Sequence, residues 1–261
     1  MTLDQFQVDA FENGPFTGNP AAVIVINEWL EEGIMQKIAQ ENNLSETAFV
    51  VDEGGTYHIR WFTPTTEVNL CGHATLASAF VFFEELGYAK ESITFQSKSG
   101  PLIVKRLGEN MQLDFPTDTL VEYGTSPILE KGLGRIPMEV LKGRDDLIAI
   151  FESQEDIEGM NPEFEVLRNM SGRGVLVTSQ GSGEYDFVSR AFFPQSGINE
   201  DPATGSAHTS LTPLWSKRLG KDEMTACQLS QRRGYFKCKL NGDRTLIAGK
   251  ARLFLKGQIF I

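Results

Sequence analysis

The chain of 261 residues contains few cysteines and has a deficit of positive charge. Its three cysteines, Cys71, Cys227 and Cys238, are odd in number and form no Cys-X-X-Cys pair, so neither a disulfide framework nor a zinc site is indicated. The 24 Lys and Arg residues against 35 Asp and Glu residues give a net charge of −11. This charge argues against nucleic acid or an anionic membrane surface as a partner. Any anionic ligand must therefore be bound by local groups.

Long apolar runs and a basic leader are also missing. The longest uncharged apolar run, ATLASAFVFF at 74–83, is about half of the ~20 residues that a bilayer requires. The opening residues, MTLDQFQVDAF, have no basic region before an apolar stretch and do not resemble a secretory signal. The composition, 41% hydrophobic and 23% charged, is typical of a globular protein. We therefore expect a cytoplasmic protein.

The apolar periodicity predicts an α+β fold. Alternation at 3–11 and the run PAAVIVI at 20–26 are typical of strands, whereas 30–41 has helical spacing that ends at Asn42 and Asn43. An apolar helix is predicted at 73–86. Many strands with few helices favour α+β layers. The remaining predictions are a helix at 162–169 and strands at 47–51, 57–62, 93–96, 102–107, 111–115, 146–151, 174–179, 186–193, 235–240, 245–249 and 252–260.

Two segments of the chain resemble each other. A shift of 130 residues superposes RWFTPTTEVNLCGHATLA (60–77) on RAFFPQSGINEDPATGSA (190–207) without a gap and with five identities. Composition alone would give about one. The turn-rich segment 116–137 is the predicted boundary between the copies. We therefore predict two similar domains, 1–117 and 118–261, related by a pseudo-twofold axis, in which the last strand can pack back on the first domain.

Small residues begin a predicted helix in each copy. They are Gly72, His73, Ala74 and Thr75 in the first, and Pro202, Ala203, Thr204, Gly205 and Ser206 in the second. The N–H groups and dipole of a helix start favour a bound anion by about 0.3–2 kcal/mol. Two such starts facing each other would bind the carboxylate of a small molecule. The alternative is a pair of core helices with ordinary caps.

Glu46, His73 and Asp201 are the candidate acid–base residues. Glu46 lies between a polar turn and the apolar run 48–51. Burial there would raise the pKa of a glutamate from ~4.3 toward ~6 to 7, where it both accepts and donates a proton. The alternatives are an exposed turn acid for Glu46, a structural helix-start residue for His73 and an N-cap for Asp201. Because Cys71 aligns with Asp201, a symmetric pair of thiols cannot form.

Three further polar residues are assigned structural roles, and Cys71 has a structural alternative. Arg60 and Arg190 each precede a phenylalanine by two residues, and we expect them to form ion pairs between the domains. His208, one turn into the second predicted helix, is expected to be structural. Cys71 can equally be a small buried apolar residue.

Four blocks carry a resemblance to a known family: TGNPAAV (17–23), LSETAFV (44–50), FTPTTEVNLCGHATLASA (62–79) and GINEDPATGSAH (197–208). They resemble the signature blocks of the phenazine-biosynthesis PhzF family, relatives of diaminopimelate epimerase and proline racemase, and they span nearly the whole chain. The resemblance implies two diaminopimelate-epimerase-like domains, each a curled mixed or antiparallel sheet around a central helix, with the site in the cleft between them. It also implies an isomerase without cofactor or metal, commonly a homodimer.

The resemblance also implies roles for individual residues. Glu46 matches the acid–base glutamate of the family, His73 and Asp201 its two supporting polar residues, and Gly72 and Ser206 its substrate-contacting helix starts. One departure is QRRGYF at 231–236, where Arg233 replaces a glycine of many relatives.

We therefore expect an isomerase that moves a proton between carbons of a small carboxylate through Glu46. Gly72, Ala74, Thr204, Gly205 and Ser206 are its predicted substrate-binding residues. One alternative is an amino-acid epimerase or racemase that uses Cys71. Another is a non-catalytic metabolite-binding protein.

Overall fold

The computed structural model covers residues 1–261, and the chain folds into two compact units. Unit 1 consists of Met1–Asp114 and Ala248–Ile261, and unit 2 of Phe115–Ile247. The predicted boundary at 117/118 lies close to the break between Asp114 and Phe115, and residues 248–261 belong to unit 1, as the prediction that the last strand can pack back on the first domain allowed. No helix combines the length and the apolar character that crossing a membrane requires.

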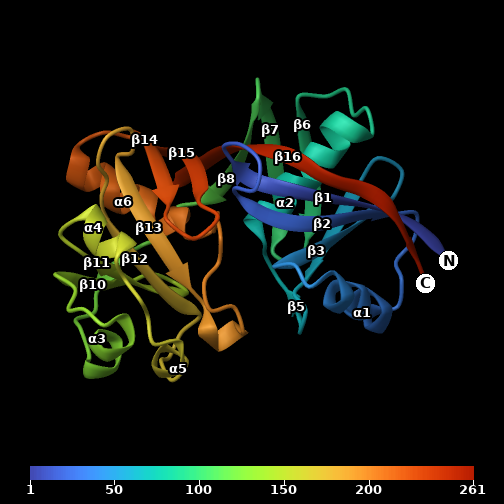
Figure 1. Ribbon diagram of the computed structural model, residues 1–261. Coiled ribbons are helices and arrows are strands. Elements are labelled where there is room, and N and C mark those ends of the chain that lie inside the picture. Colours follow the sequence, from blue (N-terminus) through green and yellow to red (C-terminus); the bar gives the residue numbers. More distant parts are fainter. The chain divides into compact units, whose positions relative to one another are not determined.

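Unit 1 is a curled sheet around helix α2 (Gly72–Phe80) (Figure 1). α2 packs against β1, β2, β3 and β7, and all of its residues from Gly72 to Ala79 are buried. A π-helical turn, Val81–Glu85, continues the helix, so the helix predicted at 73–86 is confirmed. The strands of this sheet, in order, are β1 (Thr2–Glu12), β2 (Asn19–Ile26), β3 (Glu46–Asp52), β4 (Tyr57–Phe62), β6 (Ser92–Ser97), β7 (Gly100–Leu107) and β8 (Asn110–Pro116); β5 (Glu67–Val68) pairs with β4, and β16 (Arg244–Phe260) pairs with β1 from Lys250 onward.

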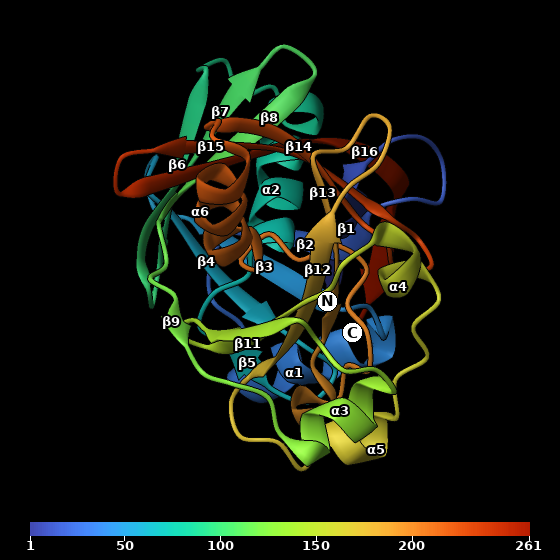
Figure 2. The same ribbon diagram turned by 90° about the vertical axis from the view of Figure 1, so that its left-hand side faces the viewer.

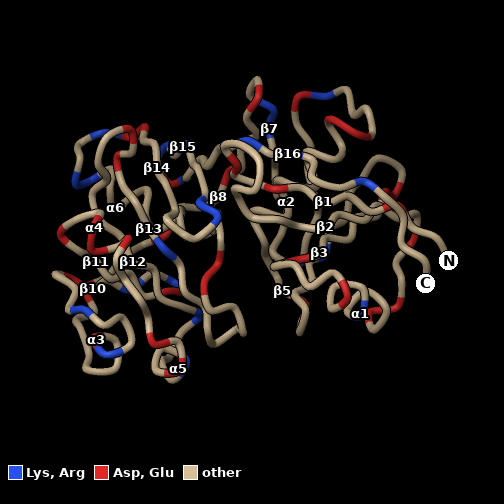
Figure 3. Tube along the Cα trace, in the orientation of Figure 1, with Lys and Arg blue, Asp and Glu red and all other residues tan.

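The outer face of this sheet is covered by helix α1 (Glu32–Asn42), which packs on β3 and β4. Its buried Met35 and Ile38 join a core with Phe49 and Phe62, whose rings meet edge to face with centroids 5.6 Å apart. With both faces covered, β2 and β3 are apolar along most of their length and do not alternate. Figure 3 accordingly shows β2 without charged positions, whereas acidic positions lie on α1.

Unit 2 contains helix α6 (His208–Leu219), which packs against β14 and β15. Helix α4 (Gln154–Glu158) packs on β12 and β13, and α3 (Pro127–Leu133) and α5 (Phe164–Leu167) lie side by side (Figure 2). The strands, in order, are β15 (Gly234–Asn241), β14 (Glu223–Gln228), β13 (Phe187–Phe192), β12 (Gly174–Gln180), β11 (Asp146–Ile150), β10 (Glu139–Lys142) and β9 (Val121–Glu122).

The two units repeat one pairing pattern. The series β1–β2–β3–β4–β6–β7 and β10–β11–β12–β13–β14–β15 both pair antiparallel, parallel, antiparallel, parallel and antiparallel. β4 and β13 are moreover related by the shift of 130 residues that relates the two sequence segments. The internal duplication is therefore present in the fold of each unit.

The copies differ where the second helix begins. The shift places its start near Pro202, but α6 begins at His208, so Thr204, Gly205 and Ser206 lie in the segment before the helix. The prediction that they open the helix is wrong. Gln228 binds the backbone N–H of Thr204 at 2.8 Å and the carbonyl oxygen of Asp201 at 2.6 Å in this segment.

Other predictions differ in extent. The helix predicted at 162–169 is only the single turn of α5, and the strands predicted at 245–249 and 252–260 are the one long strand β16. Strands β10 and β14 were not predicted. β14, EMTACQ, is short and mixes polar with small residues, so its pattern is weak although four of its residues are buried.

Candidate acid–base site

Glu46 is the first residue of β3, and its side chain is 12% exposed. It pairs in parallel register with Ala21 of β2. Asn43, in the left-handed conformation, ends α1 and turns the chain toward β3, as its position after the helical pattern predicted. Glu46 is therefore a largely buried carboxyl group and not an exposed turn acid.

His73, the second residue of α2, brings three other side chains together. Its Nε2 lies 3.2 Å from Oε2 of Glu46. Its Nδ1 lies 3.2 Å from Nδ2 of Asn19 and 3.4 Å from Sγ of Cys71. The ring is buried, with a side chain 5% exposed. Strand β2, strand β3 and the start of α2 thus each contribute to one cluster within unit 1.

The same cluster contains atoms of the types that bind Zn²⁺. One ligand atom each of Glu46, Cys71 and His73 lie within 4.8 Å of one another. Cys71, however, approaches Nδ1 of the ring and Glu46 approaches Nε2. A cation held by all three would therefore require a side chain to rotate. The absence of a metal from the reaction stays a prediction.

Gly72 and Ala74 flank His73 in the first turn of α2, and both are buried. The N–H groups of a first helical turn have no acceptor within the helix. Cys71, the N-cap, makes no side-chain cap bond, and its sulfur contacts the His73 ring instead. Gly72 and Ala74 therefore lie beside the acid–base cluster, and their contact with substrate stays a prediction.

Unit 2 holds the other predicted residues in a compact hydrogen-bonded segment. The Thr204 hydroxyl donates to the Asp201 carboxylate. Gln228 Nε2 donates to the carbonyl oxygen of Asp201 at 2.6 Å, while Gln228 Oε1 accepts from the N–H of Thr204 at 2.8 Å. Asp201 is not the N-cap of α6, which is Ala207. Asp201 and Thr204 are both 7% exposed, and Gln228, which binds both of them, is wholly buried.

Arg173 lies beside the predicted substrate-binding Ser206. Its Nη1 donates to the Ser206 hydroxyl at 3.2 Å, its guanidinium pairs with the buried carboxylate of Asp146, and it covers the Phe193 ring at 5.2 Å. Arg173, Gln228 and Asn19 are polar residues of these clusters that the sequence analysis missed. Asn19 lies within the block TGNPAAV, but no role was assigned to it.

Arg60 and Arg190 form ion pairs within their own units, so the prediction of pairs between domains is wrong. Arg60 binds Glu67 at 2.8 Å, and Arg190 binds Glu200 at 2.7 Å. The Arg60 hydrogen bond lowers the pKa of Glu67 to about 2. An arginine two residues before a phenylalanine can cover that ring and reach an acid of the segment that follows its strand, and both do so.

His208 is wholly buried, as its predicted structural role requires. Its ring stacks on Phe236 with centroids 3.8 Å apart, and its Nδ1 lies 2.9 Å from the carbonyl oxygen of Thr204. Arg233, the departure from the family pattern, has φ of 60°, in the left-handed region that favours glycine. The glycine of many relatives therefore has a conformational explanation.

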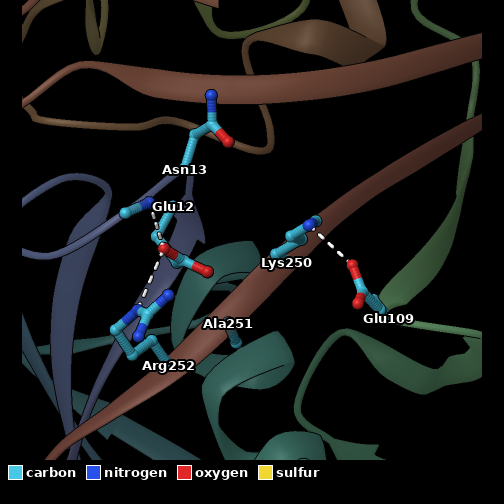
Figure 4. Close-up of a pocket in the computed structure, with 7 residues that line it drawn as sticks. Glu12, Asn13, Glu109, Lys250, Ala251 and Arg252 are labelled. Atoms are coloured by element: carbon cyan, nitrogen blue, oxygen red, sulfur yellow. Dashed lines mark hydrogen bonds and ion pairs between the residues drawn. The ribbon is translucent and has the colours of Figure 1, made fainter.

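A cavity of about 390 Å³ in unit 1 is separate from these clusters (Figure 4). Its charged lining residues are Glu12, Glu109, Lys250 and Arg252. Lys250 pairs with Glu109 at 2.7 Å and Arg252 with Glu12 at 3.2 Å, so its charges compensate one another. None of the predicted site residues lines it.

The duplicated pairing pattern, with a helix packed against each sheet, is that of the diaminopimelate epimerase-like fold class. A hydroxyproline epimerase from Agrobacterium vitis has the same fold, with a TM-score of 0.61 and 8% identity over 99% of this chain and 92% of that one. Likeness at this identity concerns the fold alone.

Closer similarities define the family. The family model PhzC-PhzF, phenazine biosynthesis-like protein, matches residues 8–257. A crystal structure of a phenazine biosynthesis protein of the PhzF family from Enterococcus faecalis has a TM-score of 0.96, with 46% identity over 100% of both chains. A Pseudomonas aeruginosa protein named an uncharacterized isomerase is 49% identical over 259 residues, 99% of both chains. The chain belongs to the phenazine biosynthesis-like (PhzC-PhzF) family.

Proposed function

We propose that this protein is a cofactor-independent isomerase in which Glu46 moves a proton between carbons of a small carboxylate. The observation that carries the proposal is the contact of 3.2 Å between Glu46 Oε2 and His73 Nε2, with side chains that are 12% and 5% exposed. Membership of the family, and relatives that are named isomerases, support an enzyme of this class.

A partly buried carboxyl group is suited to both halves of a proton shift. It accepts the proton from one carbon and, sheltered from water, returns it to another. One carboxyl group reaches one face of a substrate, so both transfers take place on the same face. Proton transfer by a placed side chain supplies about 10²- to 10⁴-fold, and positioning of the substrate supplies much of the remainder.

The substrate in this proposal is a small carboxylic acid whose neighbouring carbonyl or unsaturated group acidifies a C–H bond. Cyclic acids and aromatic precursors are candidates. Gly72 and Ala74 in unit 1 would bind it beside Glu46 and His73. Asp201, Thr204, Gly205 and Ser206 in unit 2 stay predicted site residues. The contact between Arg173 and Ser206 supports this assignment, since it places a cation beside a predicted binding residue in an acidic protein.

Solvent hydrogen exchange tests the proposal. A panel of carboxylic acids is incubated with the protein in D₂O, and carbon-bound deuterium is measured by NMR. We expect exchange with the wild-type protein and at least a 10²-fold slower rate with Glu46→Gln, which keeps the shape of the side chain but cannot carry the proton. Glu41→Gln, an exposed change on α1, is the matched control and should retain the wild-type rate. An exchange rate of Glu46→Gln equal to that of the wild-type protein would refute the proposal.

Two other readings remain as outcomes of this experiment. An epimerase that uses Cys71 has support in the contact of Cys71 Sγ with His73, and it predicts exchange that thiol alkylation abolishes. A metabolite-binding protein predicts a ligand-dependent rise in melting temperature without any exchange.

We further propose a homodimer in a reducing cytoplasm. None of the three cysteines forms a disulfide, which suits a reducing compartment. Sedimentation equilibrium would show about twice the 29.0 kDa mass of the chain if the dimer forms. A single species of chain mass would refute it.

A further inference from the structure

The two nitrogens of the His73 ring face different kinds of group. Nδ1 lies 3.2 Å from Nδ2 of Asn19, an amide nitrogen that can only donate. Nε2 lies 3.2 Å from a carboxylate oxygen of Glu46, which in its ionised form can only accept. A neutral imidazole carries its hydrogen on one nitrogen and a lone pair on the other. Because the Asn19 amide donates to Nδ1, the hydrogen of a neutral ring lies on Nε2, on the side of the Glu46 carboxylate.

Cys71 makes this choice of tautomer chemically important. Its sulfur lies 3.4 Å from the same Nδ1 that Asn19 contacts. If Nδ1 is an acceptor, the S–H group can donate to it and Cys71 remains a thiol. A thiolate–imidazolium pair, which would make Cys71 a base or nucleophile, needs a hydrogen on Nδ1. That hydrogen would face the amide N–H of Asn19, and two opposed donors in a buried site are unfavourable.

We propose that Asn19 is a positioning residue that holds His73 as the Nε2–H tautomer, so that the ring serves Glu46 and Cys71 stays a thiol. The inference rests on the proposed function, in which Glu46 is the acid–base group. It adds the residue that selects glutamate chemistry over thiol chemistry in a cluster that contains both groups.

The backbone at Asn19 is closely packed. Asn19 is the first residue of β2, is 0% exposed and pairs with Ala10 of β1. Gly18 precedes it with φ of 78°, and a Cβ there would lie 2.5 Å from the carbonyl oxygen of Ala10, so this close approach requires glycine. At the other end of the connection, Glu12 accepts from the N–H of Gly14 at 2.5 Å and from Arg252 at 3.2 Å (Figure 4).

Nitrogen-15 NMR of histidine-labelled protein at pH 7.5 tests the assignment directly. The chain has three histidines. His58 is assigned by His58→Gln, and His208 by the lack of titration near neutral pH that follows from its pKa of about 4. For His73 we expect a protonated Nε2 and an unprotonated Nδ1. No substrate is needed for this measurement.

Variants of Asn19 test whether this residue determines the tautomer of His73. Asn19→Asp presents oxygen to Nδ1 and should move the hydrogen onto that nitrogen. Asn19→Leu removes the donor and should leave a mixture of ring states. Thiolate absorbance at 240 nm should rise in Asn19→Leu, and it reports on Cys71 because the pKa values of Cys227 and Cys238 are about 12. Asn13→Asp, an exposed change in the same connection, should alter neither signal.

An Nδ1–H tautomer or an imidazolium ring in the wild-type protein would overturn the inference. So would an unchanged His73 spectrum in both Asn19 variants; if Asn19→Asp does not fold, Asn19→Leu alone decides. Failure of the proposed function gives a different result, because the expected tautomer would then be found together with full exchange activity in Glu46→Gln.

Discussion

Glu46 and Cys71 contact opposite nitrogens of the same imidazole. Glu46 Oε2 lies 3.2 Å from Nε2 of His73, and Cys71 Sγ lies 3.4 Å from Nδ1. The two candidate proton carriers therefore use different edges of the ring, and substitution can separate their contributions.

If Glu46 alone carries the proton, Cys71→Ser should retain kcat within about threefold, because a serine hydroxyl can also donate to Nδ1. The deuterium-exchange rate on an identified substrate measures this effect. A loss of about 10²-fold or more, the size expected for removal of an acid–base group, would favour the Cys71 epimerase instead.

Cys227 and Cys238 should be inert in the folded protein. Burial raises the pKa of each thiol to about 12. At pH 8 about one molecule in 10⁴ would carry either thiolate, which is the reactive form. We expect iodoacetamide to leave both cysteines unmodified in native buffer and to modify both in guanidinium, as read by peptide mass spectrometry. Rapid native labelling of Cys238 would contradict its burial.

His208 should make the protein sensitive to mild acid. Burial between Phe187 and Phe236 lowers its pKa from 6.5 to about 4. As pH falls from 6.5 toward 4, the unfolded chain binds this proton before the folded one does. Stability that is fully present above pH 6.5 is therefore lost across that window, by about 3 kcal/mol at its lower end.

Urea unfolding at pH 7, 5.5 and 4.5 measures this loss. His208→Gln should be less stable than the wild-type protein at pH 7 but should show a shallower decline toward pH 4.5. His58→Gln, at a side chain 36% exposed, is the control and should decline as the wild-type protein does. Equal slopes for all three proteins would show that His208 does not cause the acid sensitivity.

Arg233→Gly should stabilise the protein. A non-glycine residue in the left-handed region, such as Arg233, lowers the free energy of unfolding by about 1–2 kcal/mol. Glycine removes this strain but also increases the entropy of the unfolded chain, which offsets part of the stabilisation. We expect a net gain of about 0.5–1 kcal/mol in urea unfolding.

At Gly234, the next residue, a substitution should lower the stability. A Cβ on Gly234 would lie 2.5 Å from Cβ of Ala203, so Gly234→Ala should destabilise by about 1–3 kcal/mol. A destabilised Arg233→Gly would show that the arginine side chain makes a compensating contribution.

Gln228→Leu should loosen the segment that carries Asp201 and Thr204. The change leaves the Thr204 N–H and the Asp201 carbonyl without the partners that Gln228 provides, and each buried unpaired group costs about 1–3 kcal/mol. We expect lower stability in urea and, on an identified substrate, a larger loss in kcat/KM than stability alone explains. Gln231→Leu, at an exposed position, is the control. Wild-type values for Gln228→Leu would contradict the positioning role.

The local sequence pattern predicted the structure where residues that are neighbours in the chain are buried together. The uncharged run at 74–83 indicated a helix, and α2 indeed packs against β1, β2, β3 and β7. The apolar run 48–51 made burial of Glu46 one of two alternatives, and the structure selects it. The start of α6 at His208 was not predicted, and Thr204 before it is bound by Gln228, which lies 24 residues away along the chain.

The sequence alone determined the strand periodicity, the duplicated unit and Glu46, Asp201 and His73 as the acid–base candidates, because these rest on the order of neighbouring residues. Only the tertiary structure decided that Asn19 faces the His73 ring, that Arg60 and Arg190 pair within their own units, and that Gln228 supports Asp201. A polar side chain acquires its role from the atoms within about 3 Å of it. In a sheet of crossed connections those atoms come from distant parts of the chain, as with Asn19 and His73, which are separated by 54 residues.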